Sequence, residues 1–488
     1  MPSVLLFWID KSLMLQSKKN VVLILYLIAL CLIGPLIFWL SYRGGNLVVQ
    51  KSGEQRISGG GLFGLNKNPA IQKRISLGNK VLVTADINPD KQSGVQAFDS
   101  GDYSTAVLKL TSSLQFNRND PEAWIYLENS AAAAISNTIK IGVSVPIGGN
   151  LNVAREILRG VAQAQYEINH SGGIGGKLVQ VVIANDDNDP AIAKQIASEF
   201  VKDSSILAVV GHNSSDASVA AAKVYQQGGL VMISPTSVAR ALSGSGRYIF
   251  RTTPSSRAIA EALAHYSVTS AHKTKIAICS DTQAEASQSF EEEFSLALFD
   301  YGGRIIDIAC NFSAANFNPN QVPSQAVSAG AEALLLAPSV NKINQAVDVA
   351  RANKGRLALL GTHTMYTFQT LQQGKADINS MVLSVPWHPL AIPESSFPTN
   401  AKRFWGASGS WRTAMAYDAT EAIIAGLQSG LNRDQLQKAL SNSGFLVKGA
   451  TGVVQFLPSG DRNMKGTLVR VEPGKNSSTG YDFVPFKP

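Results

Sequence analysis

Short apolar runs alternate with amphipathic segments through the larger, C-terminal part of the chain. Residues 206–210 form a continuous apolar run rich in β-branched side chains that ends at Gly211, as expected for a strand buried on both faces of a parallel sheet. Residues 214–216 (Ser-Ser-Asp) offer N-cap oxygens to an Ala-rich helix over 217–227, and a second buried strand follows at 230–233. This stretch predicts one β-α-β unit.

The same alternation recurs on both sides of that unit and predicts the other elements. We expect strands at 139–145, 178–184, 275–279, 304–309, 333–337, 357–360 and 381–385, helices at 191–202, 284–301, 340–354, 413–428 and 433–441, and a strand-rich tail at 452–471. Repeated β-α-β units with short connections predict doubly wound parallel sheets, and two such runs predict two similar lobes.

The N-terminal part of the chain has a different character. Residues 21–42 carry no charge and are long enough to cross a hydrocarbon layer of about 30 Å, so we expect an uncleaved transmembrane anchor. Lys11, Lys18 and Lys19 precede it. This bias predicts a cytoplasmic N-terminus over 1–20 and a main domain outside a cell inner membrane, held by a single pass.

Two further segments separate the expected anchor from the alternating region. Residues 43–91 are polar and interrupted by glycine, which predicts a linker. Residues 92–137 contain two helical patterns around an Asn-Asp-Pro turn at 119–121 and resemble a single tetratricopeptide-like helical hairpin. A docking module and a plain helical spacer both remain open for this hairpin.

Composition and charge restrict the chemistry. The net charge of +8 comes from Lys and Arg that are scattered along the chain, which favours a basic surface near an anionic membrane over a nucleic-acid site. Cys279 and Cys310 each end an expected strand, and we interpret them as two separate buried residues, with a disulfide as the alternative in an oxidising compartment. Asp186 and Asp187 are interpreted as helix-capping residues in preference to a metal site. With no nucleotide loop and no nucleophile–base spacing, we expect neither cofactor, metal nor catalysis.

Four segments carry a resemblance to a known family. They are IKIGVSVPIGG, INHSGGIGGKLVQVVIANDDNDP, AVVGHNSSDASVAAAKVYQQGGLVMISPTS and YIFRTTPSS, and they are similar to the type I periplasmic solute-binding proteins of ABC transporters, the leucine/isoleucine/valine-binding group. The resemblance covers about 139–471. It implies an α/β type I periplasmic-binding-protein fold over 138–488, with one lobe from about 138–255 and 385–449 and the other from about 256–384 and 450–488.

The resemblance also implies a ligand site. Ser215 matches a hydroxyl on the ligand carboxylate, Thr236 a main-chain carbonyl that receives the ammonium group, and Val238 a threonine of the family. In the second lobe Glu285 replaces a tyrosine, and His363 replaces an acidic residue that binds the ammonium group. The implied ligand-binding residues are Ser214, Ser215, Thr236, Ser237, Val238, Glu285 and His363.

Plainer roles stay open for several of these residues. Ser214 and Ser215 also serve as helix caps, Glu285 as a solvated charge at a helix start, and His363 as a structural loop residue. An imidazole cannot reproduce a carboxylate toward an ammonium group, whereas Glu285 can supply an anionic partner from another position. We therefore expect a small polar ligand: an amino acid, an amide or a related compound.

Together these features predict a membrane-anchored, periplasmic solute-binding protein that hands its ligand to an ABC permease. The alternative is a ligand-sensing receptor ectodomain or scaffold on the same fold, with a signalling partner recruited through the helical hairpin.

Overall fold

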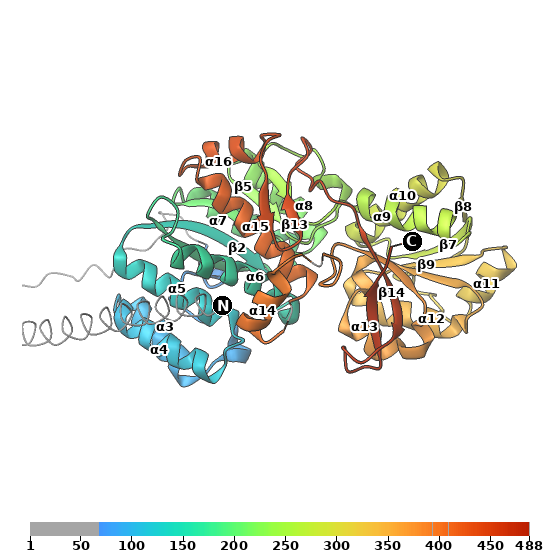
Figure 1. Ribbon diagram of the computed structural model, residues 1–488, viewed down its shortest axis with the longest axis horizontal. Helices are drawn as coiled ribbons and strands as arrows, with labels where there is room; N and C mark the ends of the chain where they lie inside the picture. The colour runs from blue at the N-terminus through green and yellow to red at the C-terminus, as the bar shows by residue number, and fades with distance from the viewer. Residues whose placement is uncertain (1–67, 393, 408, 488) are drawn as a thin grey trace, which may run out of the picture. The chain divides into compact units, whose positions relative to one another are not determined.

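The structure is a computed structural model that describes residues 68–392, 394–407 and 409–487 (Figure 1). The cytoplasmic segment expected at 1–20, the anchor expected at 21–42 and the first part of the expected linker lie outside these residues. Among the helices that the structure describes, none is both long enough and apolar enough to span a bilayer.

The first lobe is built on a six-stranded sheet in the order β1-β3-β2-β4-β5-β6. The parallel strands are β2 (Thr138–Val145), β3 (Leu178–Asn185), β4 (Ile206–Val210), β5 (Val231–Ser234) and β6 (Ile249–Arg251), and β1 (Ile75–Ser76) is an antiparallel edge strand. Its helices include α6 (Leu151–His170), α7 (Pro190–Lys202), α8 (Ser215–Gln227), α14 (Phe397–Trp405), α15 (Trp411–Leu427) and α16 (Arg433–Leu440). Every residue of β4 is buried, as its apolar run predicts.

The second lobe has a seven-stranded sheet in the order β15-β14-β11-β10-β9-β7-β8 (Figure 1). Its parallel strands are β7 (Lys275–Ser280), β8 (Arg304–Ile306), β9 (Ala333–Ala337), β10 (Ala358–Gly361) and β11 (Val382–Val385); β14 (Thr467–Pro473) and β15 (Tyr481–Pro485) are antiparallel. Helices α9 (Ser256–His265), α10 (Glu285–Asp300), α11 (Val322–Ser328), α12 (Ile343–Asn353) and α13 (Phe368–Gly374) accompany this sheet. The doubly wound core was predicted, whereas the antiparallel edges make both sheets mixed.

The boundary between the lobes differs from the expected one near the C-terminus. Strands β12 (Val447–Gly449) and β13 (Gly452–Val454) form a separate hairpin, and Val454 and Phe456 belong to the hydrophobic core of the first lobe. The carboxylate of Asp418 on α15 accepts hydrogen bonds from the N–H groups of Ala450 (2.5 Å) and Thr451 (3.4 Å). These contacts hold the hairpin on the first lobe, so the division expected at 450 is wrong and the chain returns to the second lobe only at β14.

The segment expected as a linker contains ordered structure from residue 68 onward. It forms α2 (Pro69–Gln72), β1 and a short 3-10 turn (Thr84–Asp86), and Ile71, Ile75 and Val83 are buried in the first lobe's cores. The linker prediction is therefore wrong for residues 68–91. A few well-spaced apolar residues are enough to anchor a segment that is polar on average.

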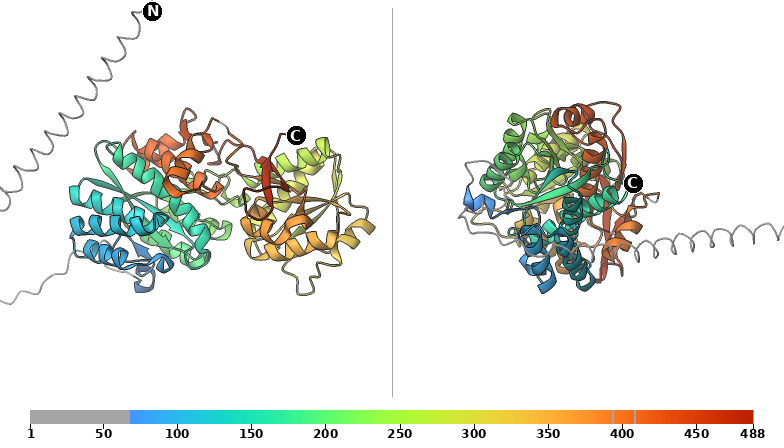
Figure 2. Two further views of the ribbon diagram at one scale, coloured as in Figure 1. Left: turned by 60° about the horizontal axis from the view of Figure 1, so that its bottom comes forward. Right: turned by 90° about the vertical axis from the view of Figure 1, so that its left-hand side faces the viewer.

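Three helices follow: α3 (Pro89–Asp99), α4 (Tyr103–Phe116) and α5 (Pro121–Ile135). The α4–α5 pair lies where a helical hairpin was expected, but α5 packs directly on the first lobe's sheet. The Asn129 side chain donates to the carbonyl of Val181 (2.7 Å) and accepts from its N–H (2.8 Å). The views of Figures 1 and 2 agree that α3–α5 lie against the first lobe. These helices are part of that lobe, and nothing supports their assignment as a tetratricopeptide repeat.

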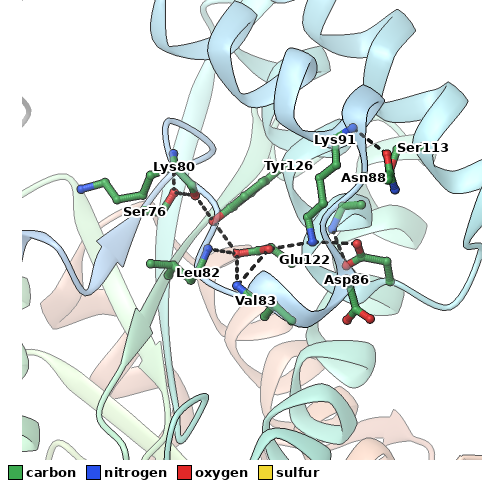
Figure 3. A network of polar contacts seen from close by, with 12 residues as sticks. Ser76, Lys80, Leu82, Val83, Asp86, Asn88, Lys91, Ser113, Glu122 and Tyr126 are labelled. Atoms are coloured by element: carbon green, nitrogen blue, oxygen red, sulfur yellow. Dashed lines mark hydrogen bonds and ion pairs between the residues drawn. The ribbon is translucent and has the colours of Figure 1, made fainter.

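A buried ion cluster fastens α3 to α5 (Figure 3). Lys91 has no exposed side-chain surface, and its Nζ lies 2.7 Å from Oδ2 of Asp120 and 2.8 Å from Oε2 of Glu122. Glu122 also accepts hydrogen bonds from the N–H groups of Leu82 (2.7 Å) and Val83 (3.2 Å). Burial raises the pKa of Asp120 despite the nearby charge of Lys91. The cluster thus depends on one lysine to balance two buried carboxylates.

We predict that Lys91→Met lowers the free energy of unfolding by about 3–5 kcal/mol, because it leaves buried charges without a counter-ion. The matched control is Lys109→Met, since Lys109 on α4 pairs with Asp90 on α3, the helix that carries Lys91, but is 46% exposed. Its expected cost is at most about 1 kcal/mol. Urea denaturation of the two variants compares them, and equal losses of stability would contradict the assignment.

Helices α6 and α15 approach each other closely at Gly160, where a Cβ atom would lie 2.2 Å from the carbonyl oxygen of Thr413. Farther along the same pair, the hydroxyl of Tyr417 donates to Glu167 (2.6 Å). Burial, followed by the charges of Glu167 and Asp418, raises the pKa of Glu421 to about 7.

This raised pKa predicts a pH-dependent stability. The folded state holds a proton on Glu421 more tightly than the unfolded state, so the stabilisation is complete below about pH 4.5 and is lost as the pH rises through 7. We expect Glu421→Gln to raise the free energy of unfolding by about 1–3 kcal/mol at pH 8 and by little at pH 5. Urea titrations at both pH values test this, with the exposed Glu394→Gln as the control. An equal effect of Glu421→Gln at both pH values would contradict it.

Candidate functional site

Loops from both lobes line one cavity of about 550 Å³. The first lobe contributes residues that follow β2, β3, β4 and β5 and the start of α15, and the second lobe contributes residues that follow β7, β9 and β10. These loops leave the carboxyl ends of parallel strands, which is where open α/β sheets bind ligands. Residues that the sequence separates by up to some 260 positions, such as Gly149 and Arg412, therefore share one cleft.

The N-terminus of α8 forms one wall of the cavity. Ser214 is its N-cap, with Oγ accepting from the N–H of Ala217 (3.1 Å), and Ser215 begins the helix. The Ser215 hydroxyl accepts a hydrogen bond from Ser237 (3.0 Å), and Thr236 Oγ1 donates to the carbonyl of Asn213 (2.9 Å). Ser214, Ser215 and Thr236 line the cavity, and their role in ligand binding stays a prediction. A helix N-terminus with hydroxyl groups favours a negatively charged ligand group.

A fully buried pair, Asp186 and His212, stabilises this wall through hydrogen bonds. Asp186 Oδ2 lies 2.6 Å from His212 Nδ1 and accepts a hydrogen bond from Ser144 (2.8 Å). Burial alone would raise the pKa of Asp186, but these contacts and the N–H of Asn188 hold it below its usual value. Asp187 pairs with Arg74 at 2.5 Å. Both carboxylates are thus engaged, and the described residues contain no cluster of three or more metal-ligating side chains.

Asp281 lies in the second lobe's wall, after β7. Its Oδ1 accepts from Ser313 (2.5 Å) and from the N–H of Gln283 (3.1 Å), and its Oδ2 accepts from Ser339 (2.5 Å). Burial would raise the pKa of Asp281, but these hydrogen bonds and the charge of Lys342 keep it below its ordinary value. The carboxylate is therefore ionised and holds three loops of the wall together.

A disulfide joins Cys279 to Cys310 next to Asp281. The interpretation of two separate buried residues is wrong, and the alternative is confirmed. The strand after α10 ends early, at Ile306, and the chain then turns back so that Phe312 N donates to Ser280 O (2.8 Å). This turn brings the two cysteines together, and the bond fixes the segment that carries Ser313.

Three of the predicted site residues do not line the cavity. Val238 is fully buried in a hydrophobic core together with Ile259 and Leu263 of α9. Ser237 is buried outside the lining, and its hydroxyl donates a hydrogen bond to Ser215. Glu285 is the first residue of α10, and its Oε1 accepts from Ser289 along the same helix (3.2 Å). Glu285 lies outside the cavity lining, whereas its neighbours Ala284 and Ala286 belong to it. The structure therefore does not place Glu285 where the expected anionic partner of the ligand would lie.

His363 does line the cavity, next to two residues that the sequence analysis missed. Its ring lies 6.0 Å from that of Trp411 in a perpendicular arrangement, and the guanidinium of Arg412 is near both. Burial, followed by the charge of Arg412, lowers the pKa of His363 to about 3. The imidazole is therefore neutral at physiological pH. Ser410, which caps α15 directly before Trp411, was the one sequence signal for these residues.

Comparisons with known proteins agree with this architecture. A family model described as "Periplasmic binding protein" matches residues 138–476. An amino acid binding protein of Pseudomonas aeruginosa is 36% identical over 115 residues, 22% of this chain and 31% of that protein. The Leu/Ile/Val-binding protein of Escherichia coli is 32% identical over 152 residues, 31% of this chain and 41% of that protein. These alignments thus span less than half of the relatives' length.

Solved structures extend the similarity to both lobes. A leucine-binding protein of Thermotoga maritima superimposes with a TM-score of 0.61 at 18% identity, covering 72% of this chain and 99% of that one. A branched-chain amino acid transporter substrate-binding protein of Streptococcus pneumoniae, in complex with isoleucine, gives 0.60 at 20% identity, with 72% and 100% covered. At these identities the likeness shows the fold. The expected anchor and the helices α3–α5 lie outside the family match.

We predict that replacing both Cys279 and Cys310 by serine lowers the free energy of unfolding by about 2–4 kcal/mol, since the disulfide closes a loop with a sequence separation of 31. Urea denaturation with and without dithiothreitol measures the change. The reductant should reproduce the loss in the unmodified chain and leave the double variant unaffected. An unmodified chain that is insensitive to reductant would contradict the bond.

Proposed function

The chain belongs to the periplasmic binding protein family, and on this premise we propose that it is an extracytoplasmic solute-binding protein of an ABC-type importer. The observation that carries the proposal is the cavity itself, which loops of both lobes line at the carboxyl ends of their strands. A ligand that contacts both walls favours the state in which the lobes are closed on it. Lobe closure would then present the loaded protein to a permease.

The proposed ligand is a small molecule with a carboxylate at the α8 end of the cavity. Ser214 and Ser215 offer hydroxyl groups there, together with the free N–H groups of the helix N-terminus. Thr236 adjoins them on the same wall, and His363 faces the cavity from the second lobe. Relatives carry names of amino acid and Leu/Ile/Val-binding proteins, which supports an amino acid or a related compound as the ligand class.

We further propose that residues 21–42 anchor the protein in the inner membrane, with the lobes on the periplasmic side. The support is the uncharged length of this segment and the lysines that precede it. Resistance of the membrane-bound chain to alkaline extraction would test the anchor, and release into the soluble fraction would contradict it.

A second candidate function is ligand sensing without transport. The observation that favours it is the presence of α3–α5, which lie outside the family match and add a helical layer to the first lobe. Such a layer offers a surface for a signalling partner. Loss of radiolabelled solute uptake on deletion of the gene supports import, whereas unchanged uptake with an altered transcriptional response supports sensing.

We predict that a bound ligand raises the unfolding temperature of the purified chain by several degrees, because saturation at 100 times Kd adds about 2.7 kcal/mol. The panel consists of amino acids, amides and small carboxylates. Ser215→Ala should weaken binding about 10- to 100-fold, the loss of one hydrogen bond to a charged group.

The matched control for that measurement is Ser198→Ala, an exposed serine of α7 whose hydroxyl donates only to the carbonyl of Lys194. It should leave the thermal shift unchanged. Absence of a shift with every member of the panel would contradict solute binding.

A further inference from the structure

The charged side chains around the cavity leave no clear partner for an ammonium group. Asp187 is paired with Arg74, and Asp281 accepts three hydrogen bonds from the second lobe's own loops. Asp216 is exposed in the first turn of α8, at the end of the cavity proposed for the carboxylate. The remaining ionic groups of the lining are cationic: Lys342 and Arg412.

Arg412 stands beside the position where the family resemblance places an acidic residue. Its guanidinium lies over the ring of Trp411, 4.5 Å from the centroid, and 3.3 Å from Oε2 of Glu156. His363 next to it is an uncharged imidazole. A positive ligand group placed here would meet a neutral ring and the guanidinium of Arg412, which disfavours it relative to water. The nearby carboxylate of Glu156 pairs with that guanidinium and lies outside the cavity lining.

Two buried polar atoms in this part of the lining lack a hydrogen-bond partner among the described residues. They are Nδ1 of His363 and Nε1 of Trp411, and the two residues are 6% and 3% exposed. The indole N–H can only donate a hydrogen bond, and an ammonium group can only donate as well. An oxygen atom of the ligand, in contrast, accepts from the indole and either donates to or accepts from the imidazole. Buried polar groups of this kind normally find a partner.

We infer that the cleft selects a carboxylic acid that carries a hydroxyl or keto oxygen where an amino acid carries its ammonium group. The carboxylate lies at the N-terminus of α8 and the oxygen near His363, Trp411 and Arg412. Val153, Val340 and the alanines at the start of α10 supply apolar lining for the hydrocarbon part. This inference rests on the proposed solute-binding function and specifies its ligand class.

Isothermal titration calorimetry of the purified full chain with matched ligands tests the inference. Each set shares one carbon skeleton: leucine, 2-hydroxy-4-methylpentanoate and 4-methyl-2-oxopentanoate; alanine, lactate and pyruvate; phenylalanine, phenyllactate and phenylpyruvate. In at least one set, the oxygenated acid should bind at least tenfold more tightly than the amino acid. An amino acid that binds as tightly as, or more tightly than, its oxygenated partners overturns the inference and leaves the solute-binding function standing. Absence of binding by every ligand overturns both.

Variants at His363 test whether this residue determines the preference for the oxygenated acid over the amino acid. His363→Glu should shift the affinity ratio at least tenfold toward the amino acid, because it restores a carboxylate beside the ligand's second polar group. His363→Gln, which stays neutral and keeps a hydrogen-bonding side chain, should retain the preference for the oxygenated acid. Glu285→Gln is the control, since Glu285 lies outside the cavity lining, and its ratio should not change.

Asp281→Asn tests the opposing possibility that Asp281 pairs with an ammonium group of the ligand. If the unmodified chain binds an amino acid tightly and Asp281→Asn abolishes that binding while sparing the oxygenated acid, the ammonium group pairs with Asp281 and the inference is wrong. An equal effect of this substitution on all members of a set agrees with the role of Asp281 in holding the wall together.

Discussion

The hydrogen-bonded pair of Asp186 and His212 holds together the strand ends of the first lobe that lead into the cavity. Asp186 follows β3 and binds Ser144 of β2, while His212 follows β4 and contacts Tyr225 of α8 at 3.2 Å. The carbonyl of His212 accepts hydrogen bonds from two serine hydroxyls, those of Ser218 on α8 and Ser234 on β5. One buried pair therefore links four strands and one helix. It thereby also fixes the position of Ser214 and Ser215, which line the cavity at the start of that helix. Buried ionisable groups are tolerated here because every contact is satisfied.

The second lobe meets the same requirement with different residues. Asp281 is the internal carboxylate of this lobe, and hydroxyl groups from two other loops stabilise its charge by hydrogen bonding. A disulfide, in place of a buried ion pair, joins the neighbouring segments. In both lobes the internal carboxylates, Asp186 and Asp281, are thus engaged in hydrogen bonds that hold the segments of the cavity wall together. The groups that remain for the ligand are hydroxyl groups, helix N–H groups, the exposed carboxylate of Asp216 at the α8 end, a neutral imidazole, an indole and two cations.

The sequence was most informative where a feature is local. The strand expected over 206–210 matches β4, because a continuous apolar run rich in β-branched residues is typical of a strand buried on both faces. Helix α8 begins within two residues of the expected start, because a serine oxygen caps it. Pairings between distant segments were harder to foresee. The two-residue strand β1 exists only through its pairing with β3, and the Cys279–Cys310 bond depends on a turn after a strand that ends early.

The site shows the same contrast. Ser214, Ser215, Thr236 and His363 were placed in the cleft from the resemblance, since these positions follow the ends of strands. Glu285 and Val238 lie outside the cavity lining, because one residue of helix rotation or one turn of a loop decides which side chain faces a cavity. Trp411, Arg412 and Lys342 were missed, because the capping Ser410 marks only the start of a helix. Nothing in the sequence indicates that this segment and the one around Lys342 converge on one cavity.

The attachment of α5 through Asn129 has a mechanical consequence. Residues 68–135 join the chain's N-terminal side to the first lobe alone, through β1, the buried ion cluster and the α5–sheet contact. If residues upstream of 68 anchor the chain as proposed, the anchor would hold the first lobe, and the second lobe would be the part that moves when the cleft opens or closes. A permease that binds the closed state would then recognise the displacement of the second lobe relative to a fixed first lobe.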